Sequence, residues 1–300
     1  MKAMLMIGLM AWLAGATHAE ARMRVVATVS NMGMLAREVG GNAVRVNVLS
    51  PPNRDAHYLE ARPSMMARLR RADLVVSVGA ELEVGWLPAA IQGANNRRVQ
   101  PGQPGYFEAA RKVELLRDDK PADRALGDVH PQGNPHLYLD PERMAQVALA
   151  LATRMGELDA DNADMFRRNA EAFAAQVAER MPAWRKRVRG APGALAYHSD
   201  MDYLLNTLGV PVLGHIEPLP GIPPTAAHLR ALVKKHAGGR GVIWSVNFHP
   251  AQAGEFMARE LGWPAHRLPS QIAIAGDAQA YFNMIEAWVA TLESSVADTK

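Results

Sequence analysis

Residues 53–64 read NRDAHYLEARPS, and this stretch decides how the rest of the chain is interpreted. It places a histidine, His57, in a loop that closes at Pro63, just before an amphipathic helix-like run. A strand-like run with alternating valines, residues 43–49, comes before the loop. In α/β proteins, ligands bind outside the carboxyl ends of the strands. The position of His57 between a strand and a helix therefore indicates a ligand-binding residue.

Two further histidines stand at similar junctions. His136 lies in NPHLYLDP, residues 134–141, before a helical pattern, and His198 lies in ALAYHSD, residues 194–200, after an apolar strand-like run. Isolated histidines of this kind, taken alone, are most often ordinary surface or core residues. Brought together between two lobes, three neutral imidazoles suit zinc and also accept manganese, copper or nickel. The three junctions together therefore favour a metal site.

Strand-like and helix-like segments alternate on both sides of one long helical pattern. This alternation predicts an α/β protein with two Rossmann-like lobes, mainly parallel sheets and the metal site in the cleft between the lobes. We expect an N-terminal lobe over residues 20–160, a linker helix over residues 161–189 and a C-terminal lobe over residues 190–300. Pro182 is expected to kink or break the linker helix.

Two other local predictions bear on the site. Residues 95–130 are rich in proline, glycine and charge, which is typical of short strands and loops. Pro141 is expected in the first turn of a helix, with Asp140 as its N-cap. His136 would then lie directly before a well-defined helix start.

The N-terminus has the features of an export signal. Lys2 is followed by an almost wholly apolar run over residues 3–15, and small residues fill positions 16–19. We expect a cleaved signal peptide over residues 1–19, with a buried first helix as the alternative. The chain has no cysteine, so we also expect a freely soluble periplasmic protein with no lipid anchor and no disulfides.

The net charge bears on the class of partner. The formal charge of +3 is small, and no basic stretch is interleaved with aromatic residues. Nucleic acid is therefore not an expected partner.

Three segments together resemble a known family. The first runs from residue 57 as HYLEARPSMMARLRRADLVVSVGAELEVGWL and contains His57, Pro63, Ala72, Asp73, Gly79 and Glu83 at the family's positions. The second is PHLYLDP at residues 135–141, and the third is His198 followed by Tyr203, Leu204 and Gly209. These segments are similar to those of the cluster A-I solute-binding proteins, the zinc- and manganese-binding receptors of ABC importers. The resemblance extends over nearly all of the mature chain, and it implies His57, His136 and His198 as metal ligands.

The fourth ligand departs from the family pattern. Many members carry an aspartate or glutamate before the tyrosine of the last helix, but residues 268–270 here are Leu-Pro-Ser. Asp277 is the nearest acid downstream and is the candidate ligand; otherwise water, or a nearby acid such as Glu217, completes the shell. Three protein ligands and a water would form an open site, the arrangement of catalytic zinc. A zinc-dependent hydrolase with an open metal site therefore stays an alternative.

Two residues are candidates for supporting roles. His130, six residues before His136, is a candidate accessory ligand, the alternative being an exposed loop residue. Glu60, next to the first ligand segment, either accepts a hydrogen bond that orients His57 or faces water.

The expected function is that of a binding protein and not of an enzyme. The resemblance implies a periplasmic receptor that captures Zn(II) as its transported ligand and delivers it to the membrane permease of a metal ABC importer. We expect the receptor to be a monomer, and a periplasmic zinc chaperone is a further candidate partner. Zinc is favoured because the matched ligands are nitrogens, whereas manganese prefers carboxylate oxygen; a Mn(II) receptor is the alternative. No acid or base stands at a spacing such as HExxH, which counts against the hydrolase.

Overall fold

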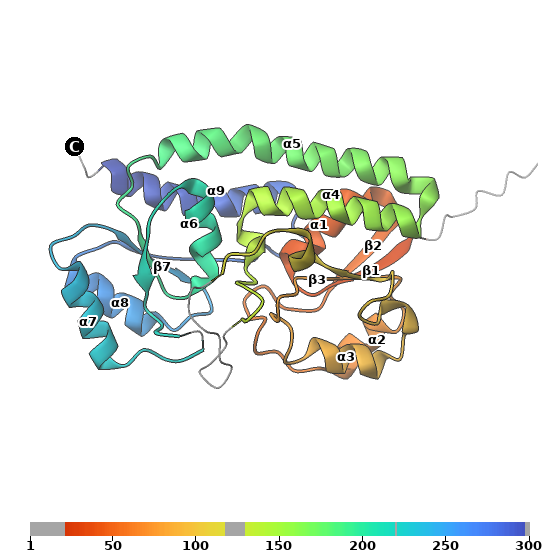
Figure 1. Cartoon of the computed structure of the whole chain (residues 1–300), viewed down its shortest axis with the longest axis horizontal. Helices are drawn as coiled ribbons and strands as arrows, with labels where there is room; N and C mark the ends of the chain where they lie inside the picture. Colours follow the sequence, from red (N-terminus) through yellow and green to blue (C-terminus); the bar gives the residue numbers. More distant parts are fainter. Residues whose placement is uncertain (1–21, 118–129, 220, 298–300) are drawn as a thin grey trace, which may run out of the picture.

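The computed structural model describes residues 22–117, 130–219 and 221–297 and contains two α/β lobes (Figure 1). Each lobe is built on a sheet of four strands, and every pair of neighbouring strands is parallel. The predicted fold class is therefore confirmed. The expected signal peptide, residues 1–19, lies outside the described residues.

The N-terminal lobe has the strand order β2-β1-β3-β4. β3 is buried along its whole length, as the run of valines predicts for a central parallel strand. The strands are β1 Met23–Ala27, β2 Val44–Val48, β3 Leu74–Ser77 and β4 Tyr106–Glu108, and the helices are α1 Ser30–Gly40, α2 Pro63–Leu69 and α3 Leu87–Ala94. Short 3-10 helices occur at Gly41–Ala43, Arg97–Val99 and Ala109–Lys112.

The C-terminal lobe repeats this arrangement with the order β6-β5-β7-β8. Its strands are β5 Ala194–Ala196, β6 Val212–His215, β7 Val242–Val246 and β8 Ala265–Leu268, and its helices are α6 Asp202–Leu208, α7 Ala226–His236 and α8 Ala251–Leu261. β8 was not predicted from the sequence. It carries only partly buried and exposed residues, because it is an edge strand, so it lacks the apolar run that marks the others.

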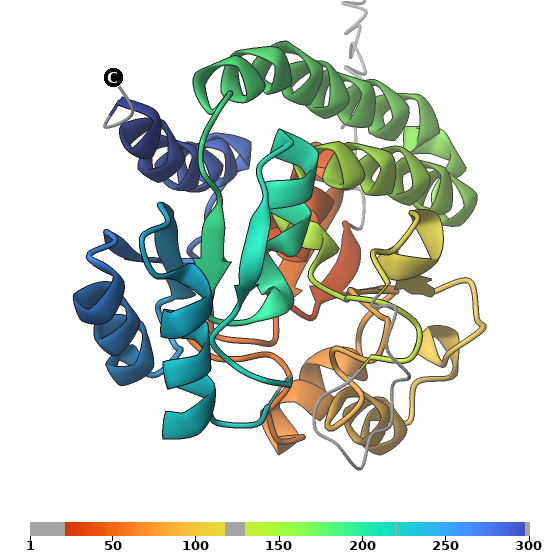
Figure 2. The ribbon, with the colours of Figure 1, turned by 60° about the vertical axis from the view of Figure 1, so that its left-hand side comes forward.

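A layer of helices covers one face of both sheets. It includes α1 and α6 together with α4 Pro141–Leu158, α5 Ala163–Arg187 and α9 Ala278–Ala297 (Figure 1). These helices share one continuous apolar core with both lobes, whereas α2 and α3, and separately α7 and α8, bury smaller cores on the opposite faces. Figure 2 shows α5 running across the top of the molecule, above the sheet that α7 and α8 flank. The two lobes therefore lie against a common support.

The two predictions about helix boundaries have different outcomes. Asp140 caps α4 as predicted, since its Oδ1 accepts hydrogen bonds from the backbone N–H of Glu142 at 2.8 Å and of Arg143 at 3.2 Å. Of the kink or break predicted at Pro182, the break does not occur, because α5 continues to Arg187. The buried side chains of Met181 and Trp184 hold this part of the helix against the core, so packing outweighs the missing backbone hydrogen bond.

Buried hydrogen bonds join the lobes beneath the cleft. The amide of Asn31, at the start of α1, donates from Nδ2 to the carbonyl of Ser270 at 2.9 Å and accepts at Oδ1 from the N–H of Ile272 at 3.1 Å. The neighbouring Ser30 hydroxyl donates to the carbonyl of Ile272 at 2.7 Å. We call these contacts the Asn31 bridge. They fix the segment after β8 against the first lobe.

Within residues 22–117, 130–219 and 221–297, no helix has both the length and the apolar character needed to cross a bilayer.

Candidate metal centre

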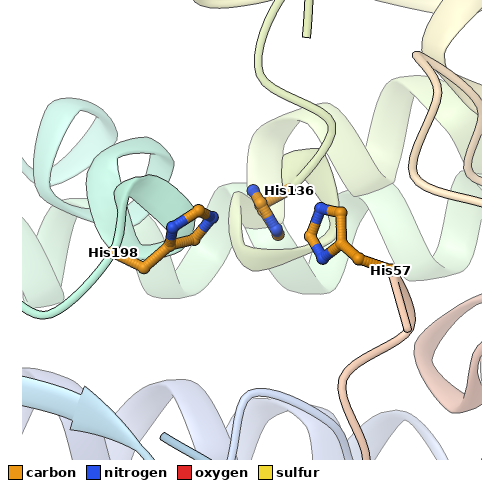
Figure 3. Close-up of side chains that lie close together, drawn as sticks. All are labelled: His57, His136 and His198. Atoms are coloured by element: carbon orange, nitrogen blue, oxygen red, sulfur yellow. The ribbon is translucent and has the colours of Figure 1, made fainter. Parts of the chain in front are cut away.

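Three histidines meet between the two lobes, as the close-up in Figure 3 shows. His57 comes from the loop after β2, His136 directly precedes the 3-10 helix Leu137–Leu139 that leads into α4, and His198 follows β5. One ring nitrogen from each lies within 4.8 Å of the corresponding nitrogens of the other two. The structure thus brings together the three histidines that the sequence singled out.

Each of these imidazoles is held through Nδ1 by an oxygen acceptor. The pairs are His57 with Asp55 Oδ1 at 2.6 Å, His136 with Asn134 Oδ1 at 2.8 Å, and His198 with Glu217 Oε2 at 2.8 Å. Such acceptors place the proton on Nδ1 and leave the Nε2 lone pair available, which is the usual arrangement of a metal-binding histidine. The buried Nε2 of His198 has no hydrogen-bond partner among the described residues.

The acceptor that orients His57 is not the one considered from the sequence. Glu60 is exposed, whereas Asp55, two residues before the histidine, accepts from both the backbone N–H of His57 at 2.9 Å and its Nδ1. An aspartate side chain commonly accepts a hydrogen bond from the backbone N–H two residues later in the same turn. The spacing of Asp55 and His57 is therefore the signal in the sequence that would have identified Asp55.

The electrostatics of the three histidines differ. Burial lowers the pKa of His136 well below its ordinary value, which keeps this imidazole neutral and able to bind a metal. Burial also disfavours the charged form of His198, but the hydrogen bond that it donates to Glu217 and the charges of Asp200, Glu217 and Asp55 outweigh burial and raise the pKa of His198 to about 9. Burial likewise opposes ionisation of Asp55, yet the hydrogen bond with His57 lowers the pKa of Asp55 to about 2.

His130 lies close to His57 and also contacts His136, with the centroids of the His130 and His136 rings 6.3 Å apart. Its Nε2 is 3.0 Å from the Nε2 of His57, and the two rings are 5.0 Å apart at their centroids. It does not belong to the group whose nitrogens all lie within 4.8 Å of one another. The structure therefore places His130 at the edge of the site, next to His57.

The candidate fourth ligand lies elsewhere. Asp277 stands directly before α9, and its Oδ1 accepts a hydrogen bond from the backbone N–H of Ala280 at 2.9 Å. It is absent from the three-histidine group and from the residues that line the adjoining cavity. Because its carboxylate caps a helix, Asp277 is not brought to the histidines in the structure.

Two residues that the sequence did not single out line the same cavity. Asp200 and His249 are both buried, and they share the cavity with His57, His136 and His198. Burial raises the pKa of Asp200 to about 7, and burial lowers the pKa of His249 to about 3. Asp200 lies two residues after His198, and His249 lies just beyond the carboxyl end of β7. These positions are the only signals in the sequence that could have identified the two residues.

The donor set fits a divalent transition metal. Three imidazole nitrogens point into one small space, each is oriented from behind, and one of them is buried without a partner. The chain has no thiols, so imidazole and carboxylate are the ligands that it can offer.

A comparison with protein families agrees with this geometry. Residues 25–295 match the family model described as "Zinc-uptake complex component A periplasmic" (ZnuA). The chain belongs to this family. Among curated relatives, the high-affinity zinc uptake system protein ZnuA of Yersinia pestis is 28% identical over 223 residues, which is 69% of this chain and 70% of the relative. The manganese ABC transporter substrate-binding lipoprotein PsaA of Streptococcus pneumoniae is 24% identical and covers 65% of this chain and 64% of its own length.

Solved structures show the same fold. FpvC of Pseudomonas aeruginosa in complex with Mn²⁺ has a TM-score of 0.78 and 25% identity, and the match covers 93% of this chain and 100% of that one. A crystal structure of ZnuA has a TM-score of 0.75 and 22% identity, with 91% and 98% covered. The family is one of substrate-binding proteins, and the chain is therefore a substrate-binding protein and not an enzyme, as predicted.

Proposed function

We propose that this protein is a periplasmic receptor that captures Zn(II) and delivers it to the membrane permease of a metal ABC importer. The observation that carries the proposal is the convergence of His57, His136 and His198, whose ligating nitrogens lie within 4.8 Å of one another between the lobes. The zinc-uptake relative supports the choice of zinc.

Zinc is proposed over manganese on the chemistry of the ligands. Three imidazole nitrogens suit Zn(II), whereas Mn(II) sites prefer more carboxylate oxygen. Relatives named for each metal exist, so the test must compare the two directly. Metal-free protein incubated with equal, limiting Zn(II) and Mn(II) should retain zinc; retention of manganese would make it a manganese receptor.

The test of the site uses single substitutions. Replacing His57, His136 or His198 by alanine removes a bond to the ion, and each change should lower zinc affinity at least roughly tenfold. The His228→Ala variant, on α7 outside the cavity, is the matched control and should bind like the wild type. Unchanged affinity in any one of the three variants would remove that histidine from the site.

His130 is proposed as an accessory ligand. Because His130 is not part of the group whose ligating nitrogens all lie within 4.8 Å of one another, His130→Ala should weaken zinc binding less than His57→Ala does. Equal losses in the two variants would make His130 a full ligand.

The remaining features of the proposal concern location and partners. We also propose a cleaved signal peptide over residues 1–19, and two lobes, residues 20–160 and 190–300, that are joined by residues 161–189. We further propose that the protein is a monomer and that a zinc chaperone is one of its partners. The expectation that the chain lacks a lipid anchor gains no support from its streptococcal relatives, since these are named lipoproteins. Fractionation of cells that express the full chain tests the periplasmic location.

A further inference from the structure

One acidic side chain at the site has no bonded partner for one of its oxygens. Asp200 is only 3% exposed, lines the same cavity as the three histidines, and its Oδ1 makes no hydrogen bond within the described part of the chain. A buried carboxylate oxygen without a partner is costly, so such a group calls for a functional explanation.

The other oxygen of this carboxylate faces a histidine of fixed tautomer. His249 stacks on Tyr197 with ring centroids 4.5 Å apart, and its Nδ1 accepts from the backbone N–H of Val246 at 3.4 Å. Because Nδ1 accepts this hydrogen bond, Nε2 is the ring nitrogen left to carry a hydrogen toward Asp200. That Nε2 is 3.8 Å from Asp200 Oδ2, so a small movement closes a hydrogen bond on this side and leaves Oδ1 free.

The other acids near the histidines are already engaged. Asp55 and Glu217 each accept from the Nδ1 of a histidine. A divalent cation held by three imidazole nitrogens in a buried site needs a negative charge close to it. Among the acids in the cavity lining, Asp200 is the one whose oxygen is not bonded to an imidazole Nδ1.

We propose that Asp200 is the fourth, anionic ligand of the transported cation, binding through Oδ1, and that His249 positions it by donating to Oδ2. This inference rests on the proposed function, since it concerns the same ion. Asp200 is not in the group whose ligating atoms all lie within 4.8 Å, so its side chain turns toward the three Nε2 atoms when the metal binds. Each of the four ligands is then held by a second residue: a hydrogen-bond acceptor behind each histidine, and the donor His249 behind Asp200.

The first experiment compares isosteric variants of the full chain. Asp200→Asn should lower zinc affinity at least roughly tenfold in a competition titration with a chromogenic chelator, because it removes the anionic ligand. Asp202→Asn is the matched control: it lies two residues along and pairs with His215 Nε2 at 2.9 Å outside the cavity lining, and it should bind zinc like the wild type.

A spectroscopic measurement separates coordination from a structural role. The visible spectrum of the Co(II)-loaded protein reports the ligand set, and at saturating cobalt it should change in Asp200→Asn and stay unchanged in Asp202→Asn. An unchanged cobalt spectrum in Asp200→Asn together with wild-type zinc affinity would overturn the inference. If instead the wild type itself bound no metal, or His57→Ala bound as well as the wild type, the proposed function would fail.

The role of His249 is tested by a double-mutant cycle. His249→Phe preserves the stacking on Tyr197 but removes the donor to Asp200, and it should lower zinc affinity severalfold. In the Asp200→Asn background the same change should have little further effect, since the pair acts as a unit. Full additivity of the two losses would show that His249 does not act through Asp200.

Discussion

Nδ1 of His198 lies 2.8 Å from Oε2 of Glu217, and this contact joins the loop after β5 to the segment that follows β6. Both side chains are largely buried, so the carboxylate holds the imidazole in one orientation and one tautomer. Glu217 was considered from the sequence as an acid that completes the metal shell. The structure places it behind a histidine.

Glu217→Ala should therefore weaken zinc binding without removing a ligand. We expect a loss of roughly 10- to 100-fold, the scale found when the acceptor behind a metal-bound histidine is removed. Calorimetry with a competing chelator measures it. Glu255→Ala, an exposed glutamate of α8, is the control and should show wild-type affinity. Equal binding by both variants would show that Glu217 does not orient the site.

Glu83 should be important for stability. Its buried carboxylate accepts from the Thr28 hydroxyl at 2.5 Å and from the backbone N–H groups of Val78 at 2.8 Å and Gly79 at 3.0 Å. Glu83→Ala leaves these donors without an acceptor and should lower the free energy of unfolding by at least about 2 kcal/mol. Urea unfolding measures the loss. The exposed neighbour substitution Val84→Ala should cost less than about 0.5 kcal/mol, and a similar cost at both positions would contradict this prediction.

Asp277→Ala separates the helix cap from a metal-binding role. Because Asp277 bonds the N–H of Ala280, the substitution should lower the free energy of unfolding by about 0.5–2 kcal/mol, as loss of an N-cap does. Zinc affinity should stay at the wild-type value. A tenfold loss of zinc affinity in this variant would return Asp277 to the metal shell in place of Asp200.

Asp73 makes part of the stability dependent on pH. Burial alone would raise the pKa of Asp73, but hydrogen bonds from the side chain and backbone of Arg24, and the charge of Arg98, lower it below the ordinary value. A carboxyl whose pKa is lower in the folded state contributes stability above its unfolded pKa of about 3.9, and this contribution is lost as the pH falls through the folded value.

The measurement compares Asp73→Asn with the wild type by urea unfolding at pH 7 and at pH 3. The variant should be less stable by about 0.5–1 kcal/mol at pH 7, a modest value because the pair is partly solvated, and the difference should shrink at pH 3. Asp164→Asn, in an exposed pair with Arg167, should change stability less at pH 7. A difference that grows toward low pH would contradict the sign.

The sequence predicted the features that depend on local signals. The Asp140 cap before Pro141 and the histidines at strand ends follow from residue type and position, and the fold class follows from the alternation of strands and helices. Edge strand β8 escaped prediction because it lacks a buried apolar run.

The rest of the site could not be predicted because it depends on three-dimensional contacts. Asp200 and His249 are 49 residues apart in the chain, and their pairing joins the segments that follow β5 and β7, which are neighbours in the sheet. Pro182 is a different case: proline tends to break a helix, but the packing of the buried residues around it keeps α5 continuous. Both cases turn on tertiary contacts that no short segment specifies.

The Asn31 bridge has a consequence for the kinetics of cargo exchange. Swinging the lobes apart would break these buried hydrogen bonds, at a cost of roughly 1–3 kcal/mol for each group left unsatisfied, and would also split the core that the layer of helices shares with both sheets. Rearrangement of the loops that carry His57 and His198 breaks neither these hydrogen bonds nor the shared core. We therefore expect an ion held by the three histidines to leave through motion of these loops while the two lobes stay in place.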